Sequence, residues 1–170
     1  MVINETERLR IRELTERDAA FALHIYNTKP FLQFVGDRHI RTIEQATQYL
    51  VDGPMKMYKE KGVGLYLVEL KACRTPIGLC GLIKRDHLEE IDIGYGYLET
   101  FFGKGYAFES CQSVLAYAKE NLNLQRVIAF TNSDNAASIK LLERLGLRFD
   151  KVIAATDNDP EMDFYSIDFK

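Results

Sequence analysis

Three apolar runs rich in β-branched and aromatic residues lie close together in the middle of the chain, and they constrain its fold more than any other feature. They span residues 65–70, 77–83 and 91–97, with only short polar or turn-forming stretches between them. Runs of this length and composition are typical of β-strands. Because parallel neighbours need a crossover of a dozen or more residues, the short breaks predict an antiparallel meander.

The segment after the third run predicts a helix and then a parallel return to the sheet. Between residues 103 and 121, apolar side chains recur with the period of an amphipathic helix. A β-rich run follows at 127–130. A strand, a helix and a strand in this order predict one parallel crossover, so the sheet is expected to be mixed.

The last part of the chain predicts another helix and two closing strands. Asp134 is a residue type that caps helices, and the apolar residues after it have helical spacing. Gly146 suits the left-handed position at the end of that helix. The closing strands are expected at residues 147–154 and 162–169, on either side of an Asp-Asn-Asp-Pro turn.

Residues 8–61 are expected to add one strand and the helical cover on the amino-terminal side. Period-2 alternation marks the strand, and a threonine followed three positions later by an acidic or amide residue marks a helix start. Pro30 and the Gly53-Pro54 pair are expected to end helices. The expected elements are a strand at 8–12, a helix from a cap at Thr15 to about Asn27, a loop at 28–41, a helix from a cap at Thr42 to about Val51, and a short helical turn at 55–61.

Charge and hydropathy exclude several classes of protein. The chain has 22 basic and 25 acidic residues and a net charge of −3, so it lacks the basic excess that would neutralise the phosphates of a nucleic acid. No apolar run reaches the roughly 18 residues of a membrane span, and the amino terminus lacks the apolar core of a signal peptide. We therefore expect a cytoplasmic protein that binds neither nucleic acid nor membrane.

Length and cysteine content predict one domain without a metal site. A chain of 170 residues, 46% apolar and free of repeats or linkers, fits a single domain over residues 1–170. Its three cysteines are far apart and form no Cys-x-x-Cys pair. Neither a disulfide framework nor a zinc site is indicated, so we expect no metal.

Residues 102–107, Phe-Gly-Lys-Gly-Tyr-Ala, are the most informative hexapeptide, because two glycines stand where a strand passes into a helix. Missing Cβ atoms let the backbone approach a ligand, and the free amides and dipole of a helix amino terminus attract an anion. Lys104 adds a positive charge. The segment is a candidate phosphate site, with a plain tight turn as the alternative. It is neither a P-loop nor a dinucleotide-binding Gly-x-Gly-x-x-Gly, whose third glycine is replaced by Phe108.

This hexapeptide resembles the acetyl-CoA pyrophosphate loop of the N-acetyltransferase superfamily known as GNAT. The loop of that family reads Arg/Gln-x-x-Gly-x-Gly/Ala, and Gly105 and Ala107 occupy its two small positions. Phe102 departs from the usual first residue, although an aromatic residue is common there in the branch of ribosomal-protein-alanine acetyltransferases, which the chain resembles most.

A second motif supports the same resemblance. Asn135-Ala-Ala-Ser138 and the later Leu-Glu-Arg-Leu-Gly-Leu of residues 142–147 resemble the Asn-x-x-Ser and Glu-Lys-Leu-Gly-Phe pattern of that branch. Residues 5–12 resemble its opening strand, and residues 92–97 resemble its fourth strand. The match therefore spans almost the whole chain.

The resemblance implies a fold and a cofactor. The fold class is α+β (mixed α/β): a mixed, mostly antiparallel sheet of six to seven strands with helices on both faces, in which strands 91–97 and 127–130 form a splayed parallel pair. The implied acyl donor is acetyl-CoA. Its implied contacts are the backbone of Tyr95, Tyr97 and Leu98, the pyrophosphate loop Phe102, Gly103, Lys104, Gly105, Tyr106 and Ala107, and the helix residues Asn135 and Ser138.

Gly94 and Gly96 lie inside the expected strand 91–97. We expect a β-bulge at these glycines, which would splay the strand from its parallel neighbour and leave an amide free for the thioester oxygen. The alternative is that the glycines only relieve crowding.

Glu90 and Asp92 are the candidate general bases, because a primary amine must lose a proton before it attacks. Period-2 alternation places both carboxylates on the strand face of Gly94. By resemblance, Asp92 occupies the position where the branch usually has Glu, and we expect a water molecule to extend its short side chain. The alternatives are another base or a merely structural carboxylate.

Ser138 matches the helix serine of the branch, whose hydroxyl reaches the departing sulfur, and Asn135 lies one helical turn before it on the same face. Ordinary capping or polar positions are the alternative for both residues. Many members of the superfamily use a tyrosine instead. The usual tyrosine position is occupied here by residues 140–142, Lys-Leu-Leu, which favours Ser138 as the proton donor.

Acceptor specificity is expected in residues 28–41 and in the closing hairpin around 157–162, which flank the same cleft in relatives. The acidic net charge favours a cationic or amine acceptor. The candidate acceptor residues are Phe31, Phe34, Asp37 and His39, of which the phenylalanines could equally belong to the core.

We therefore expect an acetyl-CoA-dependent N-acetyltransferase that acetylates a primary amine, either a protein N-terminus or a small amine, by direct attack in a ternary complex. The main alternative is a non-catalytic CoA-binding or protein-interaction module of the same fold, because Asp92 and Gly96 depart from the residues usual in the branch. A further alternative is an anion-binding fold that does not take CoA. Both a monomer and a homodimer are compatible with the sequence.

Overall fold

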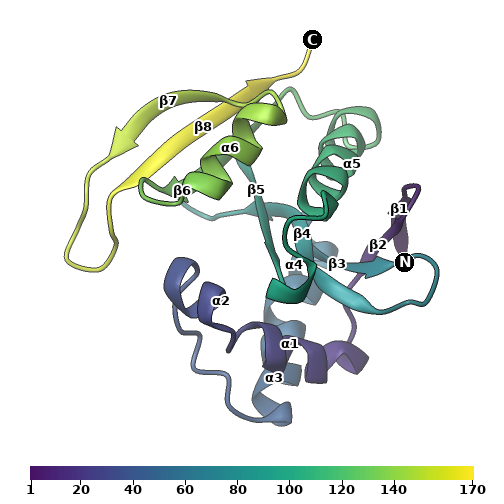
Figure 1. Cartoon of the computed structure of the whole chain (residues 1–170). Helices are drawn as coiled ribbons and strands as arrows, with labels where there is room; N and C mark the ends of the chain where they lie inside the picture. The colour runs from purple at the N-terminus through teal and green to yellow at the C-terminus, as the bar shows by residue number, and fades with distance from the viewer.

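The sheet of the computed structural model, which describes all 170 residues, has eight strands in the order β1-β2-β3-β4-β5-β6-β8-β7 (Figure 1). The strands are β1 (Val2–Glu5), β2 (Leu9–Glu13), β3 (Leu65–Leu70), β4 (Pro76–Lys84), β5 (Ile91–Tyr97), β6 (Arg126–Asn132), β7 (Arg148–Ile153) and β8 (Met162–Asp168). The helices are α1 (Ala19–Ile25), α2 (Lys29–Phe34), α3 (Ile43–Leu50), α4 (Lys56–Lys61), α5 (Tyr106–Glu120) and α6 (Ala136–Arg144). None of these helices has both the length and the apolar character needed to cross a membrane.

All neighbouring strands are antiparallel except β5 and β6. Those two run parallel, pair only at Ile91 with Val127 and at Asp92 with Ile128, and then diverge. The expected mixed sheet and splayed parallel pair are confirmed. The expected count of six to seven strands is wrong: the sequence pattern misses β1, because its mostly exposed side chains give no alternating apolar signal.

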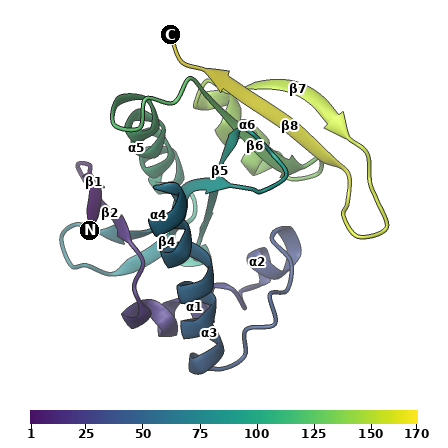
Figure 2. The ribbon, with the colours of Figure 1, turned by 180° about the vertical axis from the view of Figure 1, so that it is seen from behind.

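The core lies on both faces of the sheet, because side chains alternate along each strand. Tyr66 of β3 and Cys80 of β4 belong to a buried cluster that includes residues of α5 and α6. Their neighbours Leu67 and Leu79 belong to a second cluster with residues of α1 and α3. Both α5 and α6 lie in front of the sheet in Figure 1 and behind it in Figure 2. Helices on both faces, as expected, therefore enclose the sheet.

The segment 28–41, expected to be a loop, contains helix α2. Pro30 separates α1 from the next segment as expected, but it also lies in the first turn of α2. A proline is tolerated there, because the amide hydrogen that it lacks has no partner in a first turn and its fixed φ suits the helix. The helix holds Phe31 in a buried position, with 5% of its surface exposed.

The Gly53-Pro54 pair, expected to break a helix, does not do so. A π-helical segment, Val51–Met55, joins α3 to α4, which ends at Gly62 with a φ of 72°. Pro54 has no amide hydrogen, and its ring crowds the preceding turn. The wider π turn accommodates both effects, so the chain keeps its helical path.

Helix caps follow the sequence with one correction. Thr15 caps the 3-10 turn that leads into α1, and Thr42 caps α3. Gly146 adopts a φ of 95° after α6, as expected. Asp134 does not cap α6; its neighbour Asn135 does, by accepting a hydrogen bond from the Ser138 amide at 3.2 Å. The helix therefore begins one residue later than the capping pattern predicts.

Candidate active site

Strand β5 turns backbone amides toward the gap that opens beside β6. The Leu98 amide donates to the carbonyl oxygen of Ile77 in β4 at 2.9 Å, and the β4–β5 pairing is in continuous register. Because amides alternate in direction along an antiparallel strand, those of Tyr95 and Tyr97 point away from β4. Strand β6 pairs only with the first two residues of β5, so these two amides face the gap.

The bulge expected at Gly94 and Gly96 is wrong, because the register with β4 continues unbroken through both glycines. The gap opens because β6 turns away from β5. Gly96 relieves crowding instead: a Cβ there would lie 2.3 Å from Cζ of Phe31 in α2. The nearest atom to a Cβ on Gly94 would be Cδ1 of Ile83, at 3.0 Å.

The glycine loop ends at the amino terminus of α5. Gly103 and Gly105 have φ values of 73° and 83°, in the left-handed region that favours glycine. Gly105 is the N-cap residue, and no side chain caps the helix. The amides of the first turn, from Tyr106 to Phe108, therefore have no side-chain partner. Since residues 102–105 are exposed as well, this terminus fits an anion such as a pyrophosphate.

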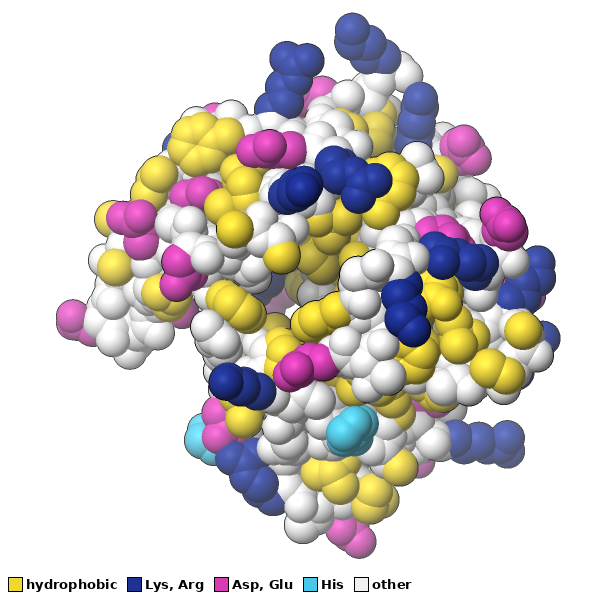
Figure 3. Space-filling view, viewed as in Figure 1, with side chains coloured by type: hydrophobic (Ala, Val, Ile, Leu, Met, Phe, Trp, Pro, Cys, Tyr) yellow, Lys and Arg dark blue, Asp and Glu magenta, His cyan; other side chains and the backbone are white.

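Three cationic side chains surround this terminus. Lys104 is exposed in the loop itself. The guanidinium of Arg144 in α6 lies 4.5 Å from the ring centroid of Phe108, and that of Arg8 lies 4.4 Å from the ring centroid of Tyr106. Figure 3 shows Lys and Arg side chains gathered over α5 and α6 on this face. Arg8 is paired with Glu109 of the same first turn, so Lys104 and Arg144 supply the positive potential that suits a polyanion.

Arg8 also fastens the glycine loop to the segment that leads into β2. Its Nη1 donates to the carbonyl oxygen of Lys104 at 2.9 Å, and its Nε donates to Oε1 of Glu109 at 2.8 Å. The hydroxyl of Thr6 donates to the other oxygen of Glu109 at 2.5 Å. Sequence reasoning misses Arg8, because 96 residues separate it from Lys104 and no motif links the two.

The hydroxyls of Tyr95 in β5 and Ser138 in α6 meet across the gap, with 2.6 Å between Oη and Oγ. Both side chains are partly buried, and burial raises the pKa of Tyr95 well above its ordinary value. Asn135, one turn before Ser138, is occupied as the cap of α6. The structure thus brings together three residues that the sequence placed in the site, but the role of the Tyr95 side chain was not expected.

Tyr97 contributes its backbone rather than its side chain. Its hydroxyl is buried and hydrogen-bonded to Ser110 of α5, inside the core. Leu98 follows it at the end of β5, with its amide bonded to β4. Tyr97 therefore borders the gap only through main-chain atoms, whereas the carbonyl oxygen of Leu98 accepts from the Phe101 amide at 3.0 Å, so both main-chain polar groups of Leu98 have partners within the protein.

The candidate base Asp92 is buried and ion-paired. Arg85 holds both of its oxygens, with Nε 2.9 Å from Oδ1 and Nη2 3.2 Å from Oδ2. The same guanidinium lies 5.9 Å from the ring centroid of Phe130 in β6. Burial raises the pKa of Asp92, and the charge and hydrogen bonds of Arg85 oppose this rise.

The second candidate base, Glu90, lies in different surroundings. It is half-buried one residue before β5, and its partner is Arg126 of β6, with 3.9 Å between Oε1 and Nε. Arg126 also pairs with Asp150 and Asp168. The two carboxylates therefore belong to separate ion-pair groups.

A cavity of about 380 Å³ lies between α2 and the hairpin that joins β7 to β8. Both segments expected to govern acceptor specificity line it, and its charged lining residues are both acidic, which gives it a negative charge. The lining residues are Gln33, Phe34, Asn132, Ser133, Asp134, Pro160 and Glu161.

The four candidate acceptor residues separate in the structure. Phe34 lines this cavity, whereas Phe31 is buried in the core. Asp37 pairs with Arg41 at 2.5 Å, and this hydrogen bond lowers the pKa of Asp37 to about 2. His39 has a φ of 59° and an exposed side chain.

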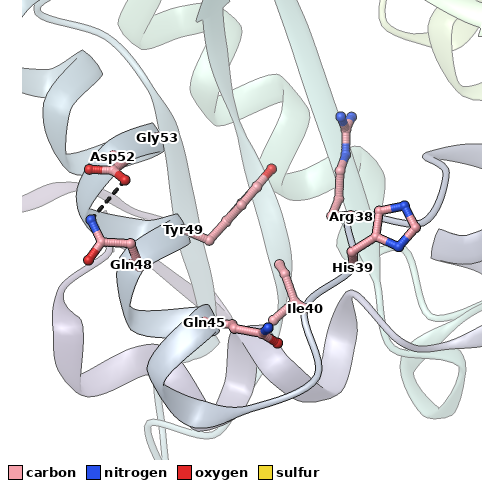
Figure 4. A pocket seen from close by; sticks show the side chains of 8 residues that line it. All are labelled: Arg38, His39, Ile40, Gln45, Gln48, Tyr49, Asp52 and Gly53. Atoms are coloured by element: carbon pink, nitrogen blue, oxygen red, sulfur yellow. Dashed lines mark hydrogen bonds between the residues drawn. The ribbon is translucent and has the colours of Figure 1, made fainter.

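A second cavity, of about 470 Å³, lies along α3 and the loop before it (Figure 4). Its lining is mostly polar, and Gln48 donates to Asp52 there at 2.8 Å. Of the residues expected in the site, only His39 lines it. The larger of the two cavities therefore contains neither the glycine loop nor the Tyr95–Ser138 pair.

A family model and a curated relative both identify the chain as similar to acetyltransferases. Residues 8–148 match the family model described as the acetyltransferase (GNAT) domain. The uncharacterised N-acetyltransferase YoaA of Bacillus subtilis is 28% identical over 153 residues, which cover 89% of this chain and 85% of YoaA.

Solved structures share the fold. An acetyltransferase from Agrobacterium tumefaciens has a TM-score of 0.81 at 24% identity, covering 98% of this chain and 94% of its own. RimL, a ribosomal L7/L12 alpha-N-protein acetyltransferase solved in complex with coenzyme A, has a TM-score of 0.86 at 16% identity, with 99% and 98% covered.

Proposed function

The chain belongs to the acetyltransferase (GNAT) domain family and is an acetyltransferase, and from this premise we propose that it transfers the acetyl group of acetyl-CoA to a primary amine by direct attack in a ternary complex. The observation that carries the proposal is the uncapped amino terminus of α5 beside the outward-facing amides of β5. A ligand with a pyrophosphate joined to an amide-bearing arm matches both features at once.

Residues 102–107 would hold the pyrophosphate through backbone amides, with Lys104 and Arg144 adding positive charge. The backbone of Tyr95 and Tyr97 would pair with the pantetheine arm, because a strand with free amides accepts an extended ligand as a further strand. Leu98 would border the arm at the end of β5 without pairing, because its amide and carbonyl are bonded within the protein. Asn135 and Ser138 would border the thioester end, across the gap from Tyr95.

When bound, acetyl-CoA supplies a thioester whose carbonyl carbon is the electrophile. The amine nitrogen forms a bond to this carbon as the carbon–sulfur bond breaks, one proton leaves the nitrogen, and one proton reaches the sulfur. Ser138 is the proposed donor of that second proton, because its hydroxyl lies beside the gap at the start of α6. Water then restores the serine proton.

We assign the general base to Asp92 acting through a water molecule, with Glu90 as the alternative. Asp92 lies on the face of β5 that Gly94 and Gly96 share, and Phe31 of α2 covers that face at Gly96. Arg85 occupies one lone pair of each carboxylate oxygen, so other lone pairs stay available to water. Burial raises the pKa of Asp92, which makes the carboxylate a stronger base.

The acceptor is proposed to enter through the cavity between α2 and the β7–β8 hairpin. Asp134 and Glu161 are the charged residues of its lining. Their charge favours a cationic acceptor, either a protein N-terminus or a small amine. The β6–α6 junction, which supplies Asp134, also supplies Asn135 and leads to Ser138, so this cavity and the proposed donor lie on one segment.

The test is calorimetric titration of the protein with acetyl-CoA, with CoA and ATP as controls for the thioester and for general phosphate affinity. Gly105→Val should abolish binding, because a β-branched residue is strained at a φ of 83° and its side chain would meet Arg8. Unchanged acetyl-CoA affinity in this variant would falsify the assignment of the loop.

A screen of peptide N-termini and small amines for thiol release should follow. Release that depends on the amine supports the transferase. Tight acetyl-CoA binding with no release from any amine would favour the non-catalytic CoA-binding module instead.

A further inference from the structure

Each hydroxyl of the Tyr95–Ser138 pair carries one proton, and the acceptors available to those protons differ. Tyr95 Oη has one hydrogen-bond partner in the structure, Ser138 Oγ, at 2.6 Å. Burial makes an O–H without an acceptor costly, because a buried donor left unpaired loses its bond to water. Either hydroxyl can donate across this distance, and donation by Tyr95 is the arrangement that gives the phenol proton a partner within the protein, with Ser138 as the acceptor.

In this arrangement the Ser138 hydroxyl proton has no acceptor within the protein. Ser138 lies in the first turn of α6, and its Oγ has no hydrogen bond to a carbonyl of the preceding turn or to any group other than Tyr95. Its amide is held separately by Asn135. A hydroxyl that accepts one fixed bond has a restricted direction in which to donate, so the free proton is confined to the gap or to solvent.

We propose that Tyr95 is a positioning residue: by donating to Ser138 Oγ across the gap, it directs the Ser138 proton toward the cofactor sulfur. This inference rests on the proposed function, because it needs CoA to occupy the gap. Tyr95 keeps its own proton throughout, since burial disfavours the phenolate. It therefore acts on the sulfur only through Ser138, and no proton passes from the tyrosine to the thiolate.

The proposal predicts a signature that needs no acceptor amine. A donor directed at the sulfur stabilises the thiolate form of bound CoA, so the protein should prefer CoA over desulfo-CoA, in which hydrogen replaces the thiol. The preference should grow as pH rises past the pKa of an ordinary alkyl thiol, about 8.5. Calorimetric affinities for both ligands from about pH 7 to about pH 9.5 measure it.

Two variants separate the roles of the hydroxyls. Ser138→Ala should reduce the high-pH preference for CoA roughly ten- to a hundredfold, because it removes a hydrogen bond to a charged group. Tyr95→Phe should reduce it by about three- to tenfold, because the serine hydroxyl remains but loses its fixed direction. Neither change should alter the affinity for desulfo-CoA, which has no sulfur to contact.

Tyr165→Phe is the matched control, since Tyr165 is a largely buried tyrosine of β8 whose hydroxyl makes no hydrogen bond to Tyr95 or Ser138. It should keep the wild-type preference. A wild-type preference in Tyr95→Phe, together with a lost preference in Ser138→Ala, overturns the positioning role. Loss in Tyr95→Phe as large as or larger than that in Ser138→Ala overturns it too, because the tyrosine would then act on the sulfur directly.

Failure of the proposed function itself looks different. If the wild-type protein binds neither CoA nor desulfo-CoA, the loop holds no CoA and the inference falls with the function. If it binds both with equal affinity at every pH, CoA binding stands and only the Tyr95–Ser138 inference is overturned.

Discussion

Gly96 has no room for a side chain, so Gly96→Ala tests how α2 is held over β5. A Cβ there would lie 2.3 Å from Cζ and 2.4 Å from Cε1 of Phe31, about 1.3 Å short of an ordinary carbon–carbon contact of about 3.6 Å. Phe31 is 5% exposed, and its ring packs edge-on against that of Tyr26, with 5.4 Å between the ring centroids, so the ring has little room to rotate away. Helix α2 must therefore move away from β5. Overpacking of this kind costs about 1–3 kcal/mol.

Urea unfolding measures this cost as a fall in the free energy of unfolding of about 1–3 kcal/mol. Adding Phe31→Leu to Gly96→Ala should cost less than the sum of the two single changes, because the smaller side chain frees the space that the new methyl group needs. Since Gln33 and Phe34 of α2 line the proposed acceptor cavity, the shift should also raise KM for the acceptor amine. The affinity for acetyl-CoA should change little.

Two other glycines provide matched controls. In Gly94→Ala the new methyl group meets the flexible end of Ile83 at 3.0 Å, so the cost should be smaller. In Gly53→Ala nothing lies within 4 Å, and helix propensity should make the change neutral or stabilising by up to about 1 kcal/mol. If Gly96→Ala unfolds at the same urea concentration as Gly94→Ala, α2 does not press on β5 and the packing argument is refuted.

Three further predictions concern the site. Ser138→Ala should lower kcat roughly ten- to a thousandfold with little change in acetyl-CoA affinity; a thiol-release assay at wild-type rate would remove Ser138 from the mechanism. Asp92→Asn should flatten the acidic limb of the pH–rate profile, and because burial raises the pKa of Asp92, the wild-type limb should lie above the ordinary aspartate range; an unaltered limb would point to Glu90 or to bulk water. CoA should slow hydrogen exchange at the amides of Tyr95 and Tyr97 but not at that of Gly96, which points to β4; equal slowing at all three would contradict the strand-like pairing.

The glycine loop and the parallel strand pair could be predicted from the sequence, because local residues determine the first and the order of elements determines the second. The splay of that pair was implied only by the resemblance, and the bulge expected to cause it is absent. Gly103 and Gly105 take positive φ values that other residues disfavour, and the loop is contiguous with the helix that it starts. The parallel crossover follows from the order of elements. Helix α2 could not be predicted in the same way, because Pro30 has opposite meanings in a helix interior and in a first turn, and only the burial of Phe31 decides between them.

The contacts that complete the candidate site depend on long-range geometry. Strand periodicity gives the face on which Tyr95 lies, but not that its hydroxyl reaches a serine 43 residues later. The pairing of Asp92 with Arg85 depends on how the turn between β4 and β5 folds back. Gly96 is an example of a residue whose role the sequence leaves open, because a glycine in a strand indicates either a bulge or a close approach of another group. Its short distance to Phe31, which is far away in sequence, shows that the close approach is the reason.

Strand β5 separates the two halves of the proposed reaction. Side chains alternate along the strand, so Tyr95 points toward α6 and the proposed donor Ser138, whereas Gly96 faces Phe31 of α2. The same helix supplies Gln33 and Phe34 to the proposed acceptor cavity. The backbone of β5, left unpaired where β6 diverges, lies between these two sides. A change at Tyr95 should therefore act on the cofactor sulfur, and a change at Gly96 should act on the amine. The two groups of substrate contacts can vary independently, so the acceptor side can change while the cofactor side is kept.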